Sequence, residues 1–558
     1  MKNLFRITIF LLSTILLYNC DSTSKSQSSL TGWNFNDPKY GNYIKGTAFQ
    51  GQKTPQGMVA IEGGTFTMGQ VQDDVMFDWN TTPQQMHIRS FYMDEAEVTN
   101  SEYLLYLQVT KDVFPPEEEK YKNIYTSALP DTLVWRSSLG NTELLSENYL
   151  RHPAYSDYPV VGVSWLQAVK YCKWRTSAVN LKNLIDRGVL SNVLANDTIR
   201  NFFDTDLYLE DPYRLFDGDS AVYKRGLPDN KIRKRGAPRP ARGAFTGRQV
   251  TSQDGILTQK FRLPTEAEWE FAAKANAENR EYNNIRGRKK YAWSGRYTRD
   301  KSTRYKGDQL ANFKQRKGNY SGLAGWSDDG SDIPIKIKSY PPNSYGLYDM
   351  SGNVAEWVAD VYRPIIDTEA NDFNYFRGNI FTKKLIDSTG QVVVIGESAK
   401  AMVTYDTLAN GKIVPMELPG EIKYVPITKD DAFMRRNYRV ASNLNKKDGD
   451  KSSSRFFDNE DDQFNRQPRM YNSPINTKDS ITGQLNQYDI KKRTTLVSNK
   501  SRVHKGGSWQ DREFWLDPAQ RRSLPEYMST NFIGFRCATD IVGSLSYKKR
   551  TARNPSRN

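Results

Sequence analysis

Cysteine and histidine are scarce in this chain, which carries three of each among its 558 residues. Three cysteines are too few for the disulfide framework of a small secreted domain, and three histidines leave little room for imidazole-based metal centres or catalysis. The sequence also contains no P-loop, no GxGxxG, no CxxC and no HExxH motif. It therefore lacks the marks of the common nucleotide-binding, thiol-redox and zinc-protease classes, and without a nucleophile elbow a Ser-His-Asp triad is unsupported.

The sequence also has no apolar run long enough to span a bilayer, and hydrophobic residues make up only 37% of the chain. A polytopic membrane protein is therefore excluded. The chain does contain 11 Trp, 32 Tyr and 25 Phe, and so many aromatic side chains need a core in which to pack. At roughly 150 residues per domain, the length predicts two to four folded units. We therefore expect a large folded body that carries long polar segments.

The N-terminus has the pattern of a bacterial export signal. A basic start precedes an apolar run at residues 7–18, which is too short to span a bilayer as a mature helix. Leu17 stands three residues before Cys20, a spacing that resembles the lipoprotein signal, whose cysteine is lipidated. We expect residues 1–20 to be a signal peptide, Cys20 to carry the lipid anchor and residues 21–53 to form a flexible tether. A secretory signal cleaved elsewhere, or an uncleaved anchor, is the alternative.

Three segments carry the start signal of a helix, in which a hydroxyl caps the first turn and a Glu or Gln three residues later reaches back. The pairs are Thr99 with Glu102, Ser164 with Gln167, and Thr265 with Glu268. Apolar residues follow at helical spacing and are expected to form buried faces: Tyr103, Tyr106 and Leu107; Trp165, Val169 and Cys172; Trp269, Ala272 and Ala273. The intervening chain is rich in Gly, Pro, Asn and Trp, which is typical of irregular loops. The pattern therefore predicts an α+β fold with little regular structure.

Two polar stretches, residues 176–260 and 364–500, are expected to be insertions in one body that spans residues 54–541. A basic tail, residues 542–558, follows this body. The net charge of +15 and the basic run at residues 224–242 suit an anionic partner such as peptidoglycan, lipid headgroups or an acidic protein face. A solvated loop is the alternative for that run.

Seven sequence blocks outside these insertions follow the order found in one enzyme family. They lie at residues 58–69, 97–100, 158–174, 262–270, 342–357, 506–509 and 533–536. On these blocks the chain resembles the formylglycine-generating enzyme and sulfatase-modifying factor family over about half of its length, at residues 54–175, 261–363 and 502–541. The resemblance implies an irregular α+β fold related to C-type lectins, interrupted by the two insertions.

By this resemblance, active members oxidise a substrate cysteine to formylglycine with copper held by two cysteines that follow the Gly-Gly-Ser block. Asp511 and Leu516 stand at those two positions. Copper(I) prefers soft thiolates, whereas aspartate offers a hard oxygen and leucine offers no ligand. Cys172 and Cys537 cannot replace the missing pair, because one lies on an apolar helix face and the other follows the Gly-Phe-Arg block. We therefore expect no copper, and no enzyme activity of this kind.

The resemblance also implies two calcium sites built from oxygen ligands in irregular loops. The first comprises the side chains of Asp349 and Glu356 with the carbonyls of Gly352 and Val354. The second comprises Asn312, Phe313, Asp329 and Ser331. Structural calcium is therefore the expected cofactor, and the alternative is that these side chains only cap turns.

The lipoprotein signal, the insertions and the stretch at residues 372–379 narrow the resemblance to the gliding-motility lipoproteins of Bacteroidota. This implies a catalytically inactive scaffold, lipid-anchored at the periplasmic face of the outer membrane, with other gliding-motility and type IX secretion proteins as partners. Nucleic acid is not an expected partner of an exported lipoprotein. The alternative is a calcium-dependent glycan-binding module, or an enzyme with a relocated site. Stacking candidates would be Trp326, Trp509 and Trp515, although packing in the core is the simpler role for each.

Overall fold

The computed structural model describes residues 27–28, 30–35, 52–69, 80–137, 140–191, 203–216, 222–223, 227–228, 247–275, 289–315, 331–363, 376–396, 402–427, 477–478, 485–486 and 500–543. The predicted signal peptide with Cys20, most of the basic run and tail, Asp329 and Trp326 lie outside these ranges. The chain divides into two compact units. One comprises Met1–Gln52 and Ala178–Thr258, and the other comprises Lys53–Ser177 and Gln259–Asn558.

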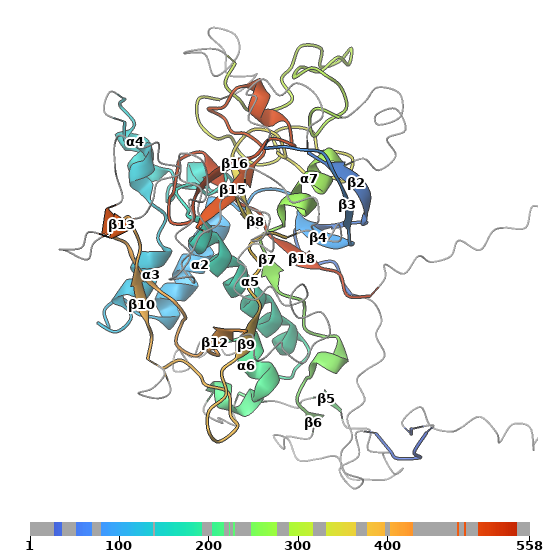
Figure 1. Cartoon of the computed structure of the whole chain (residues 1–558), viewed down its shortest axis with the longest axis vertical. Coiled ribbons are helices and arrows are strands. Elements are labelled where there is room, and N and C mark those ends of the chain that lie inside the picture. The colour runs from blue at the N-terminus through green and yellow to red at the C-terminus, as the bar shows by residue number, and fades with distance from the viewer. Residues whose placement is uncertain are drawn as a thin grey trace, which may run out of the picture. The chain divides into compact units, whose positions relative to one another are not determined.

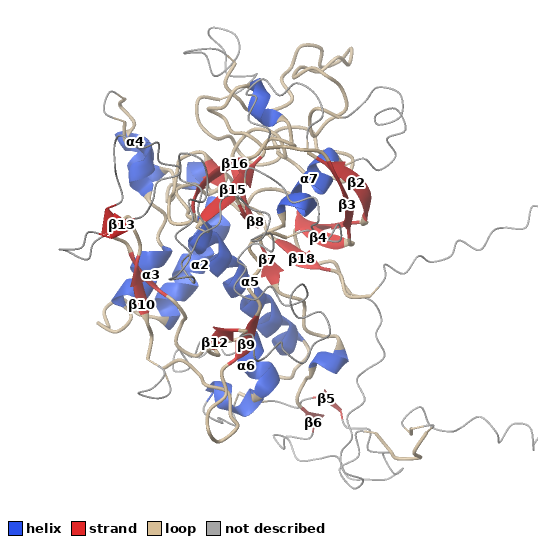
Figure 2. Cartoon of the chain, in the orientation of Figure 1, coloured by secondary structure: helices blue, strands red, loops and turns tan. Residues whose placement is uncertain are grey.

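The larger unit is built on two four-stranded sheets (Figures 1 and 2). The first is antiparallel, in the order β1 (Met58–Ile61), β4 (Phe91–Asp94), β18 (Ala538–Asp540), β7 (Phe261–Arg262). The second has the order β16 (Arg522–Pro525), β15 (Ser501–Lys505), β8 (Ala355–Val361), β17 (Ile533–Gly534), in which β17 runs parallel to β8. The strands β2 (Gly64–Met68) and β3 (Gln84–Ile88) form a separate antiparallel pair that contributes side chains to the core. Strands from both ends of the sequence thus lie side by side in one sheet.

Strand β8 and helix α7 (Glu266–Lys274) form the centre of this unit. All seven residues of β8 and all nine of α7 are buried. The main apolar cluster contains Trp269, Val358 and Phe91, and burial of such side chains is the chief force that holds the unit together, at roughly 25 cal/mol per Å². The predicted buried face of α7 is confirmed, and the rest of the helix is buried as well, because β2, β3 and β8 all contact it.

The three predicted helix starts are confirmed. Both reciprocal bonds of a capping box are present at Thr99 before α2 (Asn100–Val113), at Ser164 before α5 (Trp165–Asp186), and at Thr265 before α7. The predicted buried face of α5 is wrong at one residue, because Val169 is 37% exposed. Its neighbour Tyr171 turns inward instead and stacks on Tyr103 of α2, with ring centroids 5.6 Å apart.

Part of the second predicted insertion packs against the larger unit's helices. Residues 376–427 contain the paired strands β9 (Thr382–Lys384) with β12 (Tyr424–Pro426), and β10 (Tyr405–Thr407) with β11 (Ile413–Pro415). Lys170 of α5 donates to the carbonyl of Pro415 at 2.7 Å, and Lys412 donates to that of Leu129 at 2.9 Å, just after α3 (Lys122–Ala128). Burial lowers the pKa of both lysines to about 8. These contacts attach the segment to the unit from which it departs.

The smaller unit contains the last turns of α5 and the short helix α6 (Thr205–Glu210), with the paired strands β5 (Leu227–Pro228) and β6 (Gly247–Arg248). Asn180 of α5 binds the last residue of this unit, because its amide oxygen accepts from both the backbone N–H and the hydroxyl of Thr258 at 2.8 Å. Within the described ranges, no helix has the length and apolar character needed to cross a bilayer.

Candidate functional site

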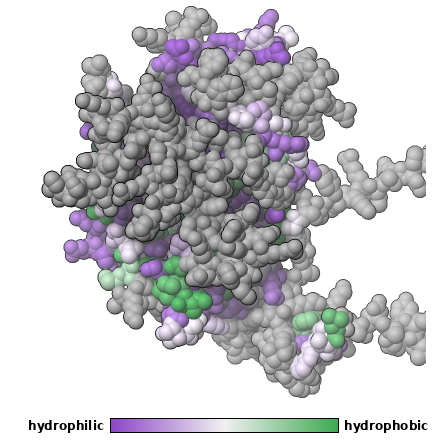
Figure 3. Space-filling view, viewed as in Figure 1, coloured by the Kyte–Doolittle hydropathy of each residue, from purple (hydrophilic) through white to green (hydrophobic). Residues whose placement is uncertain are grey.

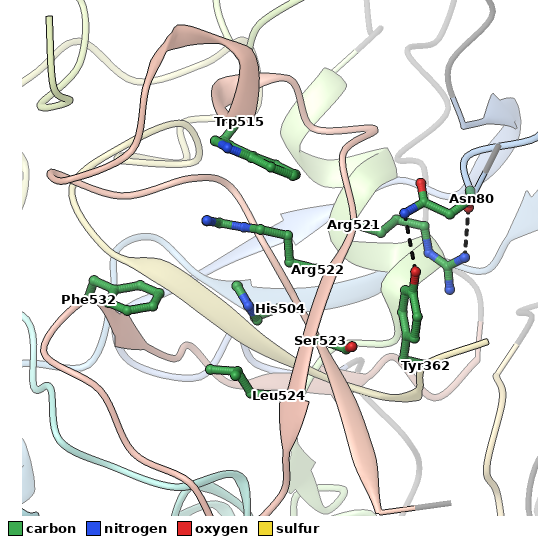
Figure 4. Close-up of a pocket in the computed structure, with 9 residues that line it drawn as sticks. All are labelled: Asn80, Tyr362, His504, Trp515, Arg521, Arg522, Ser523, Leu524 and Phe532. Atoms are coloured by element: carbon green, nitrogen blue, oxygen red, sulfur yellow. Dashed lines mark hydrogen bonds between the residues drawn. The ribbon is translucent and has the colours of Figure 1, made fainter. Parts of the chain in front are cut away.

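A pocket of about 370 Å³ opens beside strands β15 and β16 (Figure 4). It is lined by Asn80, Tyr362, His504, Trp515, Arg521, Arg522, Ser523, Leu524 and Phe532. Four consecutive residues at and just before the start of β16, Arg521 to Leu524, all line it. Aromatic and aliphatic walls thus meet two arginines and one histidine, a mixture typical of a binding pocket.

His504 is one of three buried polar residues that line this pocket, with Asn80 and Arg521. It lies opposite Arg522 in the β15–β16 pair, and Figure 4 shows its ring among Phe532, Leu524 and Arg522. Burial, and then the positive charge of Arg522, lower the pKa of His504 well below its usual value. Its Nδ1 has no hydrogen-bond partner in the described part of the chain. A neutral imidazole with one unsatisfied nitrogen can exchange a hydrogen bond with a ligand, but it carries no charge to offer at neutral pH.

Arg522 is held by Asp511, which stands at one of the two positions where the family resemblance places a copper-binding cysteine. The guanidinium donates to both carboxylate oxygens at 2.6 and 2.5 Å, and the Ser508 hydroxyl donates to the same carboxylate at 2.5 Å. Arg522 also lies 4.6 Å from the ring centroid of Trp515. Asp511 therefore orients a cation at the pocket wall, and each of its oxygens already accepts a hydrogen bond.

Leu516, the second of those positions, is fully buried in an apolar cluster with Tyr291, Ala311 and Phe313. It ends a short 3-10 helix, η8 (Glu513–Leu516), that follows the Gly-Gly-Ser block. The place where the family resemblance puts a thiolate is thus filled by a methyl-bearing side chain packed against rings. Neither position offers a soft metal ligand.

Gly507 makes the close turn beside the pocket possible. Its φ of +68° lies in the left-handed region, and a Cβ there would lie 2.7 Å from the carbonyl oxygen of Trp515. We expect Gly507→Ala to lower the free energy of unfolding by about 2 kcal/mol or more, from backbone strain plus this clash. Gly411→Ala is the control, because its φ is +80° but nothing lies within 4 Å of the added Cβ. Equal urea midpoints for the two variants would contradict the clash.

Arg521 lines the pocket and also belongs to a buried ion-pair network. It donates to both oxygens of Glu266 at 2.5 and 2.9 Å, and Lys505 bridges Glu266 and Glu270 at 3.3 and 2.9 Å. Burial would raise the pKa of Glu270, but the charges of Lys274 and Lys505 outweigh it and lower that pKa to about 2. The arginine therefore acts as a fixed support for the pocket floor.

The first predicted calcium position lies in a buried acidic cluster. Glu356 is bound at both oxygens by Arg536, at 2.7 and 2.6 Å, and it also accepts from the Trp269 indole at 2.8 Å. Asp349 accepts from a backbone N–H through Oδ2, while its Oδ1 has no hydrogen-bond partner in the described chain. Glu97, which the sequence interpretation missed, joins the same cluster.

Burial and mutual repulsion raise the pKa values of two carboxyl groups in this cluster. Burial, together with the charge of Glu356, raises the pKa of Asp349 to about 6. Burial, and then Asp349 and Glu356, raise the pKa of Glu97 well above its usual value. The three carboxyl groups together do not have the geometry of a metal site, but the unpartnered Oδ1 of Asp349 is a hard oxygen of the kind that calcium binds. Glu356 fits less well, since Arg536 already occupies both of its oxygens.

The described part of the second calcium position is satisfied by internal hydrogen bonds. The Asn312 amide accepts from Ser331 N at 3.0 Å and donates to Ile333 O at 2.9 Å, and its carbonyl accepts from Asn353 N at 2.8 Å. Asn312 and Phe313 are buried, and Asp329 lies outside the described residues. Across the part of the chain that the structure describes, no group of three or more His, Cys, Asp or Glu side chains has the geometry of a metal site.

The tryptophans named as candidates for stacking on a sugar lie in different environments. Trp509 is only 7% exposed and stacks on Trp135 with centroids 6.2 Å apart, so it packs in the core. Trp515 lines the pocket. The sequence interpretation missed His504, because no motif marks it, and it missed that the thiols of Cys172 and Cys537 lie 3.4 Å apart.

Comparisons with known proteins identify the family and several relatives. A model of the sulfatase-modifying factor enzyme 1-like domain matches residues 45–402. The chain is 25% identical to the formylglycine-generating enzyme of Bos taurus over 311 residues, covering 55% of this chain and 58% of that enzyme, so it spans a little over half of the relative. It is 35% identical to the inactive C-alpha-formylglycine-generating enzyme 2 of Mus musculus over 104 residues, 18% of this chain and 27% of the relative. PvdO from Pseudomonas aeruginosa covers 89% of this chain and 99% of its own, at 14% identity and a TM-score of 0.35.

Proposed function

This chain belongs to the family of the sulfatase-modifying factor enzyme 1-like domain, and from that premise we propose that it is a catalytically inactive, lipid-anchored scaffold of the gliding-motility and type IX secretion machinery. In this proposal the chain is the gliding-motility lipoprotein GldJ, with the paralogue GldK as the near alternative. In this proposal, Cys20 anchors the chain to the outer membrane at its periplasmic face. Its partners are other components of the same machinery, and peptidoglycan is a further candidate.

One observation carries the loss of activity. Asp511 is engaged by Arg522 and Ser508, and Leu516 is fully buried among aromatic rings. A thiolate copper site cannot form from these two side chains, while the fold around them is retained. An enzyme fold that keeps its architecture without its metal ligands is suited to binding partners, since fold alone does not determine function.

The activity can be tested directly on the purified chain. After copper loading and dialysis, we expect no stoichiometric copper and no conversion of a cysteine peptide to formylglycine by mass spectrometry. A formylglycine-generating enzyme assayed in parallel shows that the peptide and copper are competent. Conversion by this chain at more than one turnover would disprove the inactive assignment.

The scaffold role needs a test in cells. The insertion residues 376–427 pack on the body, so the deletion should spare them and remove residues 431–475. In a gliding strain that lacks its own copy, we expect this deletion to be anchored at normal level but to lose gliding and cross-links to motility or secretion proteins. The complete chain is the control. Normal gliding and secretion with the deletion would contradict a partner role for this segment.

A calcium ion at Asp349 is part of this proposal, and its removal has a defined pH signature. The pKa of the Asp349 carboxyl is higher in the folded chain than in the unfolded chain. Its contribution to stability is therefore complete below the unfolded pKa near 4 and is lost as the pH rises through about 6. For Asp349 the loss is roughly 3 kcal/mol. In EDTA we therefore expect the melting temperature to fall between pH 4 and 7 more steeply than in Asp349→Asn. Calcium should restore the wild type at pH 7, and a melting curve indifferent to EDTA at that pH would contradict the site.

The alternative function is a calcium-dependent glycan-binding module. Trp515 beside the neutral His504 in the pocket favours it, because an aromatic face and an uncharged hydrogen-bonding group suit a sugar. Calcium-dependent binding on a glycan array that Trp515→Ala abolishes would support this reading over a purely protein-binding scaffold.

A further inference from the structure

An exposed basic loop spans residues 294–309, and none of these residues lines the pocket. It contains five cationic and two acidic residues within sixteen positions. Arg296, Lys301, Arg304 and Lys306 are exposed. In Figure 1 the loop belongs to the yellow-green segment at the top, where the surface in Figure 3 is strongly hydrophilic. Such a concentration of one charge attracts anions.

The loop is held in one conformation by its own backbone. Leu310 N donates to Thr298 O at 2.9 Å, Asp300 N to Asp308 O at 2.8 Å, and Gly307 N to Asp300 O at 3.0 Å. At its base, the Trp293 indole donates to Tyr297 O at 2.9 Å, and Trp293 stacks on the fully buried Tyr291, with centroids 4.8 Å apart. A pre-ordered loop loses little conformational entropy when a ligand binds.

Two tyrosines stand out of this loop next to its cations. Tyr297 is 60% exposed and Tyr305 is 50% exposed. The ammonium of Lys301 lies 3.9 Å from the ring centroid of Tyr297, and the guanidinium of Arg304 lies 5.2 Å from that of Tyr305. In each pair the cation lies over one face of an exposed ring, so an aromatic surface and a positive charge are presented together. One carboxylate oxygen of Asp300 accepts a local hydrogen bond from Ser302 N at 2.7 Å.

We propose that this loop is a binding surface for an anionic polysaccharide. Aromatic rings pack against the apolar faces of sugar rings, and the adjacent cations pair with carboxylate or phosphate groups on the chain. A lipid surface fits less well, because residues 294–309 include no Leu, Ile, Val, Met, Phe or Trp to insert among acyl chains. The choice of polysaccharide over single-stranded nucleic acid rests on the proposed function, which places the chain in the cell envelope.

The test uses the full chain with Cys20→Ser, which prevents lipidation. Its affinity is measured for polygalacturonate, for uncharged dextran, for an oligothymidylate and for phosphatidylglycerol vesicles. We expect polygalacturonate to bind in a salt-sensitive manner and dextran not to bind. The triple variant K301E/R304E/K306E should weaken binding at least tenfold. The control K111E/K122E/R151E makes the same change in net charge at exposed sites elsewhere and should leave affinity within about twofold.

A second variant separates the polysaccharide from simple ion exchange. Tyr297→Ala combined with Tyr305→Ala keeps every charge, and we expect roughly fivefold weaker binding to polygalacturonate. Unchanged affinity in this variant, equal weakening by the control triple, or tighter binding to the oligothymidylate or the vesicles would each overturn the proposal. These results bear on the loop alone, because the inactive scaffold is tested separately by formylglycine conversion and gliding.

Discussion

Replacing Arg536 with methionine is expected to destabilise the folded chain by about 3–5 kcal/mol, because it leaves buried carboxylates without their cation. Arg536 is fully buried, and its guanidinium makes two bonds to Glu356 and two to the backbone carbonyls of Asp94 and Tyr348. Glu97 and Asp349 lie close enough to repel Glu356 when ionised.

Three further measurements separate this mechanism from a simple packing defect. Arg536→Met with Glu356→Gln should recover part of the stability, since it removes the orphaned charge. The loss in Arg536→Met should also be smaller at pH 5 than at pH 8, because the carboxyl groups can then take up protons. Arg136→Met is the matched control, because both side chains of its pair with Glu143 are more than half exposed and solvent screens the interaction, so this variant should lose little stability. Urea unfolding followed by tryptophan fluorescence gives all four values, and no difference between the Arg536 and Arg136 variants would contradict the prediction.

The sequence predicted the local features of this fold well. Capping boxes depend on residues three apart, and all three were found where their hydroxyl and Glu or Gln residues indicated. The α+β class also followed from local signals, namely short amphipathic helices separated by turn-forming residues. Burial of Cys172 followed from its place among apolar neighbours on α5.

Features set by distant partners were not predictable in the same way. Arg536 and Glu356 are separated by 180 positions, and no periodicity relates them. The full burial of α7 depends on strands that flank it in space and not in sequence. The attachment of residues 376–427 through Lys170 and Lys412 is hidden as well, because their polar composition reads as a solvated insertion. The pocket has the same origin, since His504, Trp515 and Phe532 converge only once β15 and β16 have paired.

Oxidising the pair Cys172 and Cys537 is the second change for which we expect a large effect. Cys172 lies in α5, Cys537 immediately precedes β18, and their sulfur atoms are 3.4 Å apart with both side chains buried. In the oxidising envelope that the proposed function implies, two thiols at this distance can lose two protons and two electrons to a disulfide oxidant. The bond would close a loop of 365 positions, and the chain-entropy model gives a stabilisation of up to about 6 kcal/mol for such a loop.

The route to this bond depends on when the thiols are accessible. Burial, and then the neighbouring Cys172, raise the pKa of Cys537 well above its usual value, so the folded thiol is rarely the thiolate that reacts. We therefore expect oxidised glutathione to form the bond efficiently during refolding and slowly after folding is complete. Thiol counting and mass spectrometry after each treatment report the bond, and the unfolding midpoint with and without reductant reports its stabilisation.

Cys172→Ala is the control for this experiment, because it removes the bond but leaves the small buried volume almost filled. In that variant the midpoint should not respond to reductant, whereas in the wild type refolded with oxidised glutathione it should fall. Both states should pack alike, since the two elements already meet through Tyr171 and Phe535, whose ring centroids are 5.3 Å apart. A wild-type chain that keeps both thiols after oxidative refolding would show that the contact between α5 and the end of the chain is held by packing alone.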